Sequence, residues 1–294
     1  MLGNLLHDVR YALHGFASRP MFAVVVVLTL AVGIGVNVAV FSLFDRIMLR
    51  ELNVANPHEL VKLVSPGPRA GNQLGNQQGT DDETFSYPLF RELEAAGEPD
   101  VDLAASWIAQ VSLGNGDRTV RGSAVLVSGD YFSVLGVGPE LGRVLAEQDV
   151  VDAEPAAAVV LSFEYWTTAF GADPAVLGKT LLVAGQPLEV VGVAPRGFVG
   201  TTPGNKSNVF APLTLDWYRD AQLPNPIVAD RFFTYLYVFG RLRPGASLDA
   251  VRAKLDVTFR AIINDVEAPQ IAARSVAAGR EFQEEAEYRA RTLS

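Results

Sequence analysis

The chain has 294 residues, of which 49% are hydrophobic and 19% are charged, so it can bury a substantial core and is not intrinsically disordered. Its net charge of −9 is uneven: residues 1–50 carry four Arg against two Asp, so the remaining residues carry −11. Such an acidic body repels phosphate backbones, which argues against nucleic-acid binding. The sequence has no cysteine, which excludes disulfides and thiolate metal sites.

Ahead of the longest apolar run, residues 1–19 have the pattern of an amphipathic helix. Apolar side chains recur there at helical spacing, namely Leu2, Leu5, Leu6, Val9, Leu13 and Phe16. We predict that this helix lies at a membrane interface and ends near Ser18-Arg19-Pro20, because proline disfavours a continuing helix. The alternative is that the segment is the upstream part of one long helix, which Pro20 opposes.

The run from Pro20 to Phe44 contains no charged residue. A helix from Phe22 to Phe44 would be about 34 Å long, enough for a hydrocarbon core of about 30 Å, so we predict a membrane-spanning helix over 20–46. A cleaved secretory signal is the first alternative, but the run is too long and lacks an A-x-A cleavage pattern. A buried helix of a soluble protein is the second, and the same length disfavours it.

One face of the predicted span carries Thr29, Gly33 and Asn37, which repeat every four residues. Small and amide side chains let a second membrane helix approach and can donate hydrogen bonds to it, worth about 0.6 to 2 kcal/mol each. We interpret these three residues as a helix-packing face. The alternative is that Thr29 bonds its own helix backbone and that Gly33 is incidental.

The chain after Arg50 mixes helices and strands, which predicts an α+β fold. Its first half predicts a strand over 60–64, a polar loop over 65–79, and a helix over 87–96 that Ser86 caps and Gly97 ends. A hairpin through Asn115-Gly116 and a short helix ending at Leu135 follow. The hairpin strands are expected over 101–113, interrupted or bent, and over 118–127.

The second half predicts a strand over 159–161, a helix capped by Ser162, and a hairpin over 180–193. Residues 195–230 are rich in Pro, Gly and Asn and are expected to be mostly loop, with Trp217 on a brief helical turn. The segment 232–242 is the longest strand candidate and should be central, and Ser247 should cap a helix running to Val266. The order of elements suggests two β-α-β copies with the 140–230 block inserted between them.

Motifs for chemistry are weak throughout the sequence. Gly178-Lys179-Thr180 is no phosphate loop, because six residues separate Gly171 from Gly178 where the motif requires four, and a strand rather than a helix is expected to follow. The three histidines lie far apart, and the carboxylates at 81–83 and 147–154 are interpreted as solvated loop residues. There is no G-x-S-x-G elbow. We therefore expect no enzyme, no catalytic or metal residues and no cofactor.

Three segments carry a resemblance to a known family. They are Asp8-Val9-Arg10-Tyr11-Ala12-Leu13 with the run from Leu28 to Ser42, Val127-Ser128-Gly129-Asp130-Tyr131-Phe132 with Gly142-Arg143, and Val160-Leu161-Ser162 with Trp166, Phe170-Gly171 and Gly178-Lys179-Thr180. Together they resemble the opening of MacB/FtsX-type ABC transporter permeases, especially the acidobacterial type that lacks a fused ATPase.

The resemblance implies a MacB-like periplasmic core behind the anchor. A porter-like subdomain would comprise residues 50–138 and 231–294, and a β-rich, sabre-like subdomain would be inserted at 139–230. It also implies an inner-membrane protein whose large domain is extracytoplasmic. Its partners would be other permease helices, a separate cytoplasmic ABC ATPase and a periplasmic protein.

The function implied by the resemblance is coupling of ATPase-driven motion to export or to an extracytoplasmic partner. Such permeases continue into three further membrane helices that this sequence does not contain, so a fragment or a half-permease is expected. The alternative is a binding or sensing module with a single anchor and no transport activity.

Overall fold

The computed structural model describes residues 20–48, 54, 56–75, 79–115, 118–150, 157–202, 204–218, 227–277 and 284–294. Internal contacts divide the chain into two units, Met1–Glu51 and Leu52–Ser294, and each is considered by itself. The amphipathic helix predicted over 1–19 lies outside the described residues.

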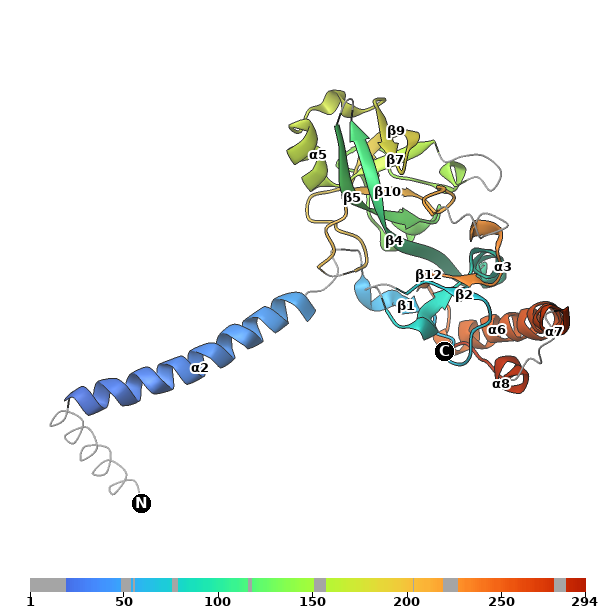
Figure 1. Cartoon of the computed structure of the whole chain (residues 1–294), viewed down its shortest axis with the longest axis horizontal. Helices are drawn as coiled ribbons and strands as arrows, with labels where there is room; N and C mark the ends of the chain where they lie inside the picture. Colours follow the sequence, from blue (N-terminus) through green and yellow to red (C-terminus); the bar gives the residue numbers. More distant parts are fainter. Residues whose placement is uncertain are drawn as a thin grey trace, which may run out of the picture. The chain divides into compact units, whose positions relative to one another are not determined.

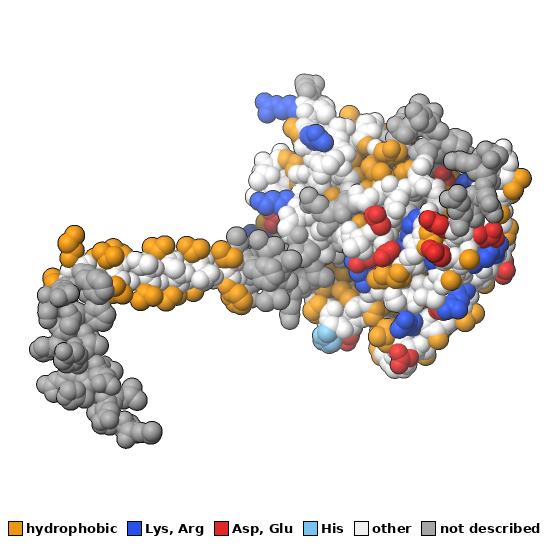
Figure 2. Space-filling view, turned by 60° about the horizontal axis from the view of Figure 1, so that its bottom comes forward, with side chains coloured by type: hydrophobic (Ala, Val, Ile, Leu, Met, Phe, Trp, Pro, Cys, Tyr) orange, Lys and Arg blue, Asp and Glu red, His pale blue; other side chains and the backbone are white. Residues whose placement is uncertain are grey.

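The first unit contains the long helix α2, Pro20–Met48. Pro20 occupies its first position, where the missing N–H costs no helical hydrogen bond. Within α2, Val24–Ser42 has a mean hydropathy of 2.6, and none of that window is buried. Figure 2 shows hydrophobic side chains along the length of this helix, interspersed with uncharged white atoms, and no charged side chain among them. The predicted apolar helix over 20–46 is thus present and is long and apolar enough to cross a membrane.

The second unit is built on one mixed sheet of ten strands (Figure 1). Its main path runs β1-β12-β4-β5-β10-β7-β9-β6, while β3 pairs with β12, and β8 pairs with β4 and β9. The strand bounds are β1 Leu60–Lys62, β3 Thr84–Phe85, β4 Val101–Asn115, β5 Arg118–Val127, β6 Leu141–Gly142, β7 Ala158–Leu161, β8 Thr180–Val183, β9 Gln186–Val193, β10 Val209–Pro212 and β12 Leu236–Leu242. A separate parallel pair joins β2, Asn72–Gln73, to β11, Phe233–Thr234.

The β4–β5 hairpin connects the two ends of this sheet. Its ladder runs without interruption from the Ser106–Val127 pair to the Asn115–Arg118 pair. The first half of β4 pairs with β12, whereas Leu113 and Gly114 near its end pair with β8. The turn predicted at Asn115-Gly116 is described only at Asn115, the last residue of β4. The two flanking strands are confirmed, and the first runs from Val101 to Asn115 without interruption.

Helices cover both faces of the sheet and enclose two apolar cores. The helix bounds are α3 Tyr87–Gly97, α4 Tyr131–Leu135, α5 Phe163–Phe170, α6 Leu248–Ala261, α7 Ala268–Ala277 and α8 Glu285–Arg289. Short 3₁₀ turns are Pro57–Glu59, Asp81–Glu83, Glu147–Asp149, Pro174–Val176 and Ile227–Ala229. The larger core contains Phe90 of α3 and Phe259 of α6, and the smaller one surrounds Tyr131 and Phe132 of α4.

Two predicted helix starts are confirmed with their caps. The Ser86 Oγ accepts a hydrogen bond from the Leu89 N–H, and the Ser162 Oγ accepts one from the Tyr165 N–H, at 3.4 and 3.2 Å. Each oxygen satisfies one of the amide donors that a helix leaves free at its amino end. Ser247 also lies at the N-cap position of its helix, as predicted, but its side chain makes no capping hydrogen bond, so that part of the prediction is wrong.

The prediction that residues 195–230 are mostly loop did not include the four-residue strand β10, which lies between β5 and β7. All four residues of β10 are buried, so the strand shows no alternation of polar and apolar residues. A four-residue apolar run that ends in proline gives little local indication of a central strand. Trp217 lies in no helix, contrary to the prediction.

The segment predicted as one strand over 232–242 forms two strands, β11 and β12, and β4 is longer than either. Its central position is confirmed, since β12 pairs with β1 on one side and β4 on the other. The helix predicted to run from Ser247 to Val266 continues past its expected end, through η6, a π-helical segment over Ile262–Glu267. Pro269 explains the wide turn, because a regular helix would press its ring against the carbonyl four residues earlier.

Candidate functional site

The predicted packing face of α2 carries three exposed residues, all of which are described. The Thr29 Oγ1 donates to the Val25 carbonyl at 2.8 Å, and the Asn37 Nδ2 donates to the Gly33 carbonyl at 2.9 Å. A Cβ added at Gly33 would meet no atom within 4 Å. An asparagine amide offers two N–H donors and one acceptor oxygen, so Asn37 retains capacity for a further partner.

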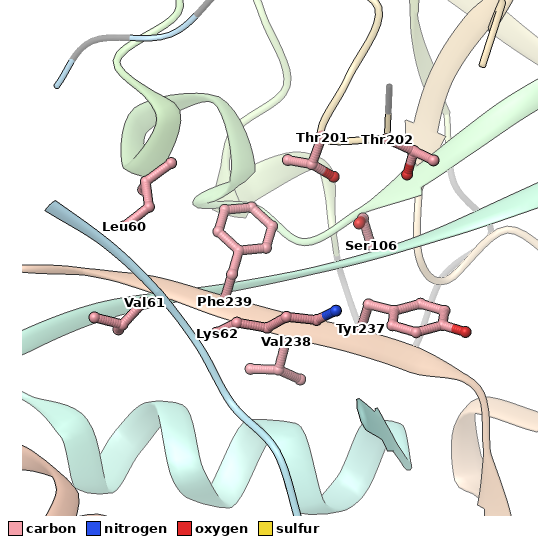
Figure 3. Close-up of a pocket in the computed structure, with 9 residues that line it drawn as sticks. All are labelled: Leu60, Val61, Lys62, Ser106, Thr201, Thr202, Tyr237, Val238 and Phe239. Atoms are coloured by element: carbon pink, nitrogen blue, oxygen red, sulfur yellow. The ribbon is translucent and has the colours of Figure 1, made fainter. Parts of the chain in front are cut away.

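A cavity of about 190 Å³ opens on the sheet at β1 and β12 (Figure 3). It joins segments far apart in the sequence: the two strands, one residue of β4 and a loop near residue 201. The lining residues are Leu60, Val61, Lys62, Ser106, Thr201, Thr202, Tyr237, Val238 and Phe239. In Figure 3 the two loop threonines lie across the cavity from the Phe239 ring and the Lys62 side chain.

Lys62 is the one cationic side chain among the lining residues, and its charge is neutralised by an ion pair with Glu83. The Lys62 Nζ lies 2.5 Å from the Glu83 Oε2 and 5.7 Å from the centre of the Tyr237 ring. The same Glu83 oxygen accepts the Thr80 N–H at 2.9 Å. The cavity therefore presents aliphatic and aromatic surface with hydroxyl groups and little net charge, a combination suited to an uncharged, partly apolar group.

Three of the described carboxylates considered in the sequence, Glu83, Glu147 and Asp149, are engaged in ion pairs. Glu147 lies 2.9 Å from Arg91, and Asp149 lies 2.6 Å from Arg143. Asp152 and Glu154 lie outside the described residues. Among the residues that the structure describes, no group of three or more His, Asp or Glu side chains could hold a metal ion.

A family model described as the MacB-like periplasmic core domain matches residues 23–257. The chain belongs to this family. The match begins inside α2 and ends inside α6, so it includes the apolar helix as well as the sheet. The prediction of a MacB/FtsX-type permease domain of α+β fold is thereby confirmed.

A curated relative and two solved structures are similar to this MacB-like chain. The macrolide export ATP-binding/permease protein MacB of Aggregatibacter actinomycetemcomitans is 35% identical over 82 residues, which are 28% of this chain and 12% of that protein's length. The periplasmic region of MacB from Actinobacillus actinomycetemcomitans matches with a TM-score of 0.48 and 17% identity, covering 71% of this chain and 87% of that one. The extracellular domain of the ABC-type transporter YknZ from Gram-positive bacteria gives 0.45 and 15%, covering 67% and 91%.

The MacB-like domain also contains a buried charged cluster that sequence reasoning missed. The Tyr288 hydroxyl donates to the Glu267 Oε2 at 2.5 Å, and the Arg291 Nη2 donates to the Ser65 Oγ at 3.0 Å. Burial raises the pKa of Glu267, and burial together with Arg291 lowers the pKa of Arg69 to about 9. Contacts across more than 200 residues leave no local pattern, so only the unusual burial of charged residues reveals the cluster.

Proposed function

We propose that this chain is the membrane-anchored extracytoplasmic part of a MacB/FtsX-type ABC permease of the inner membrane. A separate cytoplasmic ATPase would drive movement of the membrane helices, and the domain would transmit it to a substrate or partner outside. The observation that carries the proposal is the family match, which covers residues 23–257 and so includes most of the apolar helix as well as the sheet.

We also propose the division into a porter-like subdomain, 50–138 with 231–294, and a sabre-like insertion, 139–230. The sheet supports it, because β1, β3, β4 and β12 gather at one end while β6, β7 and β9 of the insertion form the other. The β4–β5 ladder joins the two ends. A displacement of β12 would therefore reach the insertion through continuous hydrogen bonds rather than through a flexible linker.

The orientation can be tested with single cysteines, because the chain has none of its own. Val276→Cys places a thiol on an exposed position of α7, where the valine is 77% exposed, and Val125→Cys buries one in β5. We expect a membrane-impermeant maleimide to label the first variant in cells with a permeabilised outer membrane and the second only after denaturation. Labelling of Val276→Cys only after the inner membrane is broken would place the domain in the cytoplasm and overturn the proposal.

The packing face of α2 is tested by crosslinking to other permease helices. Gly33→Cys and Gly35→Cys form a matched pair, since an added side chain meets no atom within 4 Å at either site and the two positions point about 200° apart. We expect crosslinks from residue 33 and few from residue 35. Asn37→Leu should weaken crosslinking from Phe41→Cys on the same face, and unchanged crosslinking would refute the packing role of Asn37.

The second candidate function is a binding or sensing module with a single anchor. The cavity at β1 and β12 favours it, because a ligand could bind there without any further membrane helix. Absence of crosslinks from both glycine positions, together with correct extracytoplasmic labelling, would favour this module over the permease.

A further inference from the structure

The cavity at β1 and β12 has a floor whose side chains are placed by strand register. Lys62 of β1 pairs with Phe239 of β12, and Tyr237 of β12 pairs with Ser106 of β4. Directly paired residues point to the same face of a sheet, and so do residues two apart in one strand. The four side chains therefore share one face, and Figure 3 shows Phe239 and Ser106 on the side that faces the loop threonines.

The two aromatic rings of the floor are held by residues that do not line the cavity. The Phe239 ring meets the Tyr131 ring in a T-shaped arrangement, with centroids 5.7 Å apart. The Tyr237 ring lies nearly parallel to the Trp107 ring, with centroids 6.2 Å apart, and its hydroxyl donates to the Gly79 carbonyl at 3.3 Å. Neither ring can turn into the cavity without losing these contacts, so the space is pre-formed.

A loop covers the cavity on the side opposite the sheet. Gly200 in this loop has φ +94°, and a Cβ added to it would lie 3.3 Å from the Tyr131 hydroxyl oxygen. The next two residues, Thr201 and Thr202, lie across the cavity from the floor (Figure 3). Tyr131 is fully buried and contacts both Gly200 above and Phe239 below, so it sets the distance between the loop and the sheet.

The charges around the cavity favour a neutral ligand. Lys62 is paired with Glu83, so an anion that entered would lose its hydration without gaining an unpaired cation. The hydroxyl groups of Ser106, Thr201 and Thr202 can each donate and accept a hydrogen bond, which suits a hydroxyl group on the ligand.

The size and the aromatic lining favour a single aromatic ring. Tyr237 and Phe239 stand two residues apart on β12, which places them about 7 Å apart along the strand, and aromatic rings attract one another at centroid distances of about 4.5 to 7 Å. The cavity volume is about 190 Å³. An apolar cavity of about 150 Å³ in another protein holds benzene, so one substituted ring fits here and a fused ring system or a peptide does not.

We propose that this cavity binds a free aromatic alcohol of one ring, with the ring against Phe239 and Tyr237 and the hydroxyl group toward Thr201 and Thr202. Such a ligand would serve the binding module named above as the second candidate function, so its biological role rests on that candidate. The binding itself depends only on the second unit and does not require the transport role.

The test is methyl NMR on the full chain in detergent micelles, with phenol as the probe and its free concentration fixed by equilibrium dialysis. Leu60, Thr201 and Thr202 carry methyl groups in the lining, whereas Leu181 is buried in β8 and does not line the cavity. We expect phenol to shift the first three along one saturable curve, half-complete on the order of 1 mM, and to leave Leu181 unchanged. Benzoate has the same ring with a negative charge and should bind at least tenfold more weakly.

A matched pair of variants locates the site. Thr202→Phe should fill the cavity and weaken phenol binding at least tenfold, whereas Thr119→Phe places the same side chain on an exposed position of β5 and should leave binding unchanged. If Thr202→Phe fails to fold, the comparison of phenol with benzoate on the wild-type chain decides.

Absence of saturable shifts with phenol, equal binding of benzoate, or unchanged binding in folded Thr202→Phe would overturn the proposal. Binding of N-acetyltyrosinamide at least tenfold tighter than phenol would assign the cavity to a tyrosine side chain of a partner protein, and would also overturn it. None of these measurements depends on membrane orientation or on other permease helices, so their failure leaves the transport role unaffected.

Discussion

The hydrogen bond between Tyr288 and Glu267 offers a sharp test of how the carboxyl-terminal segment is held. Tyr288 lies in α8, Glu267 lies at the end of η6, and both are less than 4% exposed. The substitution Tyr288→Phe keeps the ring, and with it the contact with the Arg291 guanidinium, but removes the hydroxyl donor. Glu267 then loses its shortest hydrogen bond while it remains buried.

Loss of a donor to a buried carboxylate costs about 2 to 3 kcal/mol of unfolding free energy at neutral pH. The cost depends on pH with a definite sign. Burial already raises the pKa of Glu267 above its ordinary value, and loss of the hydroxyl donor raises it further. At a pH above the pKa of Glu267 in the variant, the carboxylate is charged and the full loss of unfolding free energy is observed. As the pH falls through that pKa, Glu267 becomes protonated and no longer requires the hydroxyl donor, so the loss becomes smaller. Tyr288→Phe should therefore destabilise the domain more at pH 8 than at pH 5.

The assay is urea unfolding of the full chain in detergent micelles, followed by tryptophan fluorescence. Tyr235→Phe is the matched control, because the Tyr235 hydroxyl is fully buried and has no hydrogen-bond partner among the described residues. Its removal should leave stability unchanged or raise it by up to about 1 kcal/mol. A Tyr288→Phe effect below about 0.5 kcal/mol, or an effect equal at both pH values, would refute the reasoning.

The remaining predictions use the same unfolding measurement. Gly192→Ala should cost about 3 kcal/mol, because its Cβ would lie 1.9 Å from the Arg143 carbonyl oxygen, whereas Gly138→Ala, whose Cβ meets nothing within 4 Å, should change stability by less than about 0.5 kcal/mol; equal effects would contradict the close approach of the backbones. Burial raises the pKa of Glu94 to about 7 despite the nearby Arg91, so wild-type stability should fall as the pH rises from about 4.5 through 7. Glu94→Gln should remove this slope, so its free energy of unfolding relative to wild type should be about 1 kcal/mol higher at pH 8 than at pH 5, after a reduction for solvent screening. An unchanged slope would contradict the raised pKa of Glu94. Asn208→Ala should cost about 1 kcal/mol, because the Asn208 Oδ1 accepts the Ser123 N–H at 2.9 Å at the start of β10, and a neutral result would show that water replaces it.

Elements with a local physical cause could be predicted from the sequence. The α2 helix follows from the length of an uncharged run, and α3 and α5 begin where serine hydroxyls cap them. The β4–β5 strands follow from alternation around a turn. In each case the residues that cause the element lie within it or next to it.

Elements whose cause lies elsewhere in the chain could not be predicted. The short strand β10 is stabilised by pairing with β5 and β7, which precede it by some 50 to 85 residues, so nothing within it distinguishes it from an apolar loop. The cavity has the same origin, since Lys62, Ser106 and Tyr237 meet only because β1 and β4 flank β12. On α2 the sequence does specify which residues share a face, and what contacts that face stays a prediction.

The segment after the anchor bears directly on the proposed coupling, because it is fixed to the middle of the sheet. Arg241 of β12 donates to the Asn56 carbonyl at 3.1 Å, to the Glu59 carboxylate at 2.9 Å, and through its Nε to the Val134 carbonyl of α4 at 2.6 Å. One side chain thus ties the residues around Asn56 to the central strand β12 and to helix α4. If movement of α2 is transmitted outward, as we propose, the load enters at Asn56 and passes through Arg241 into β12. From there it reaches β4 and β5 through the ladder that leads into the inserted segment.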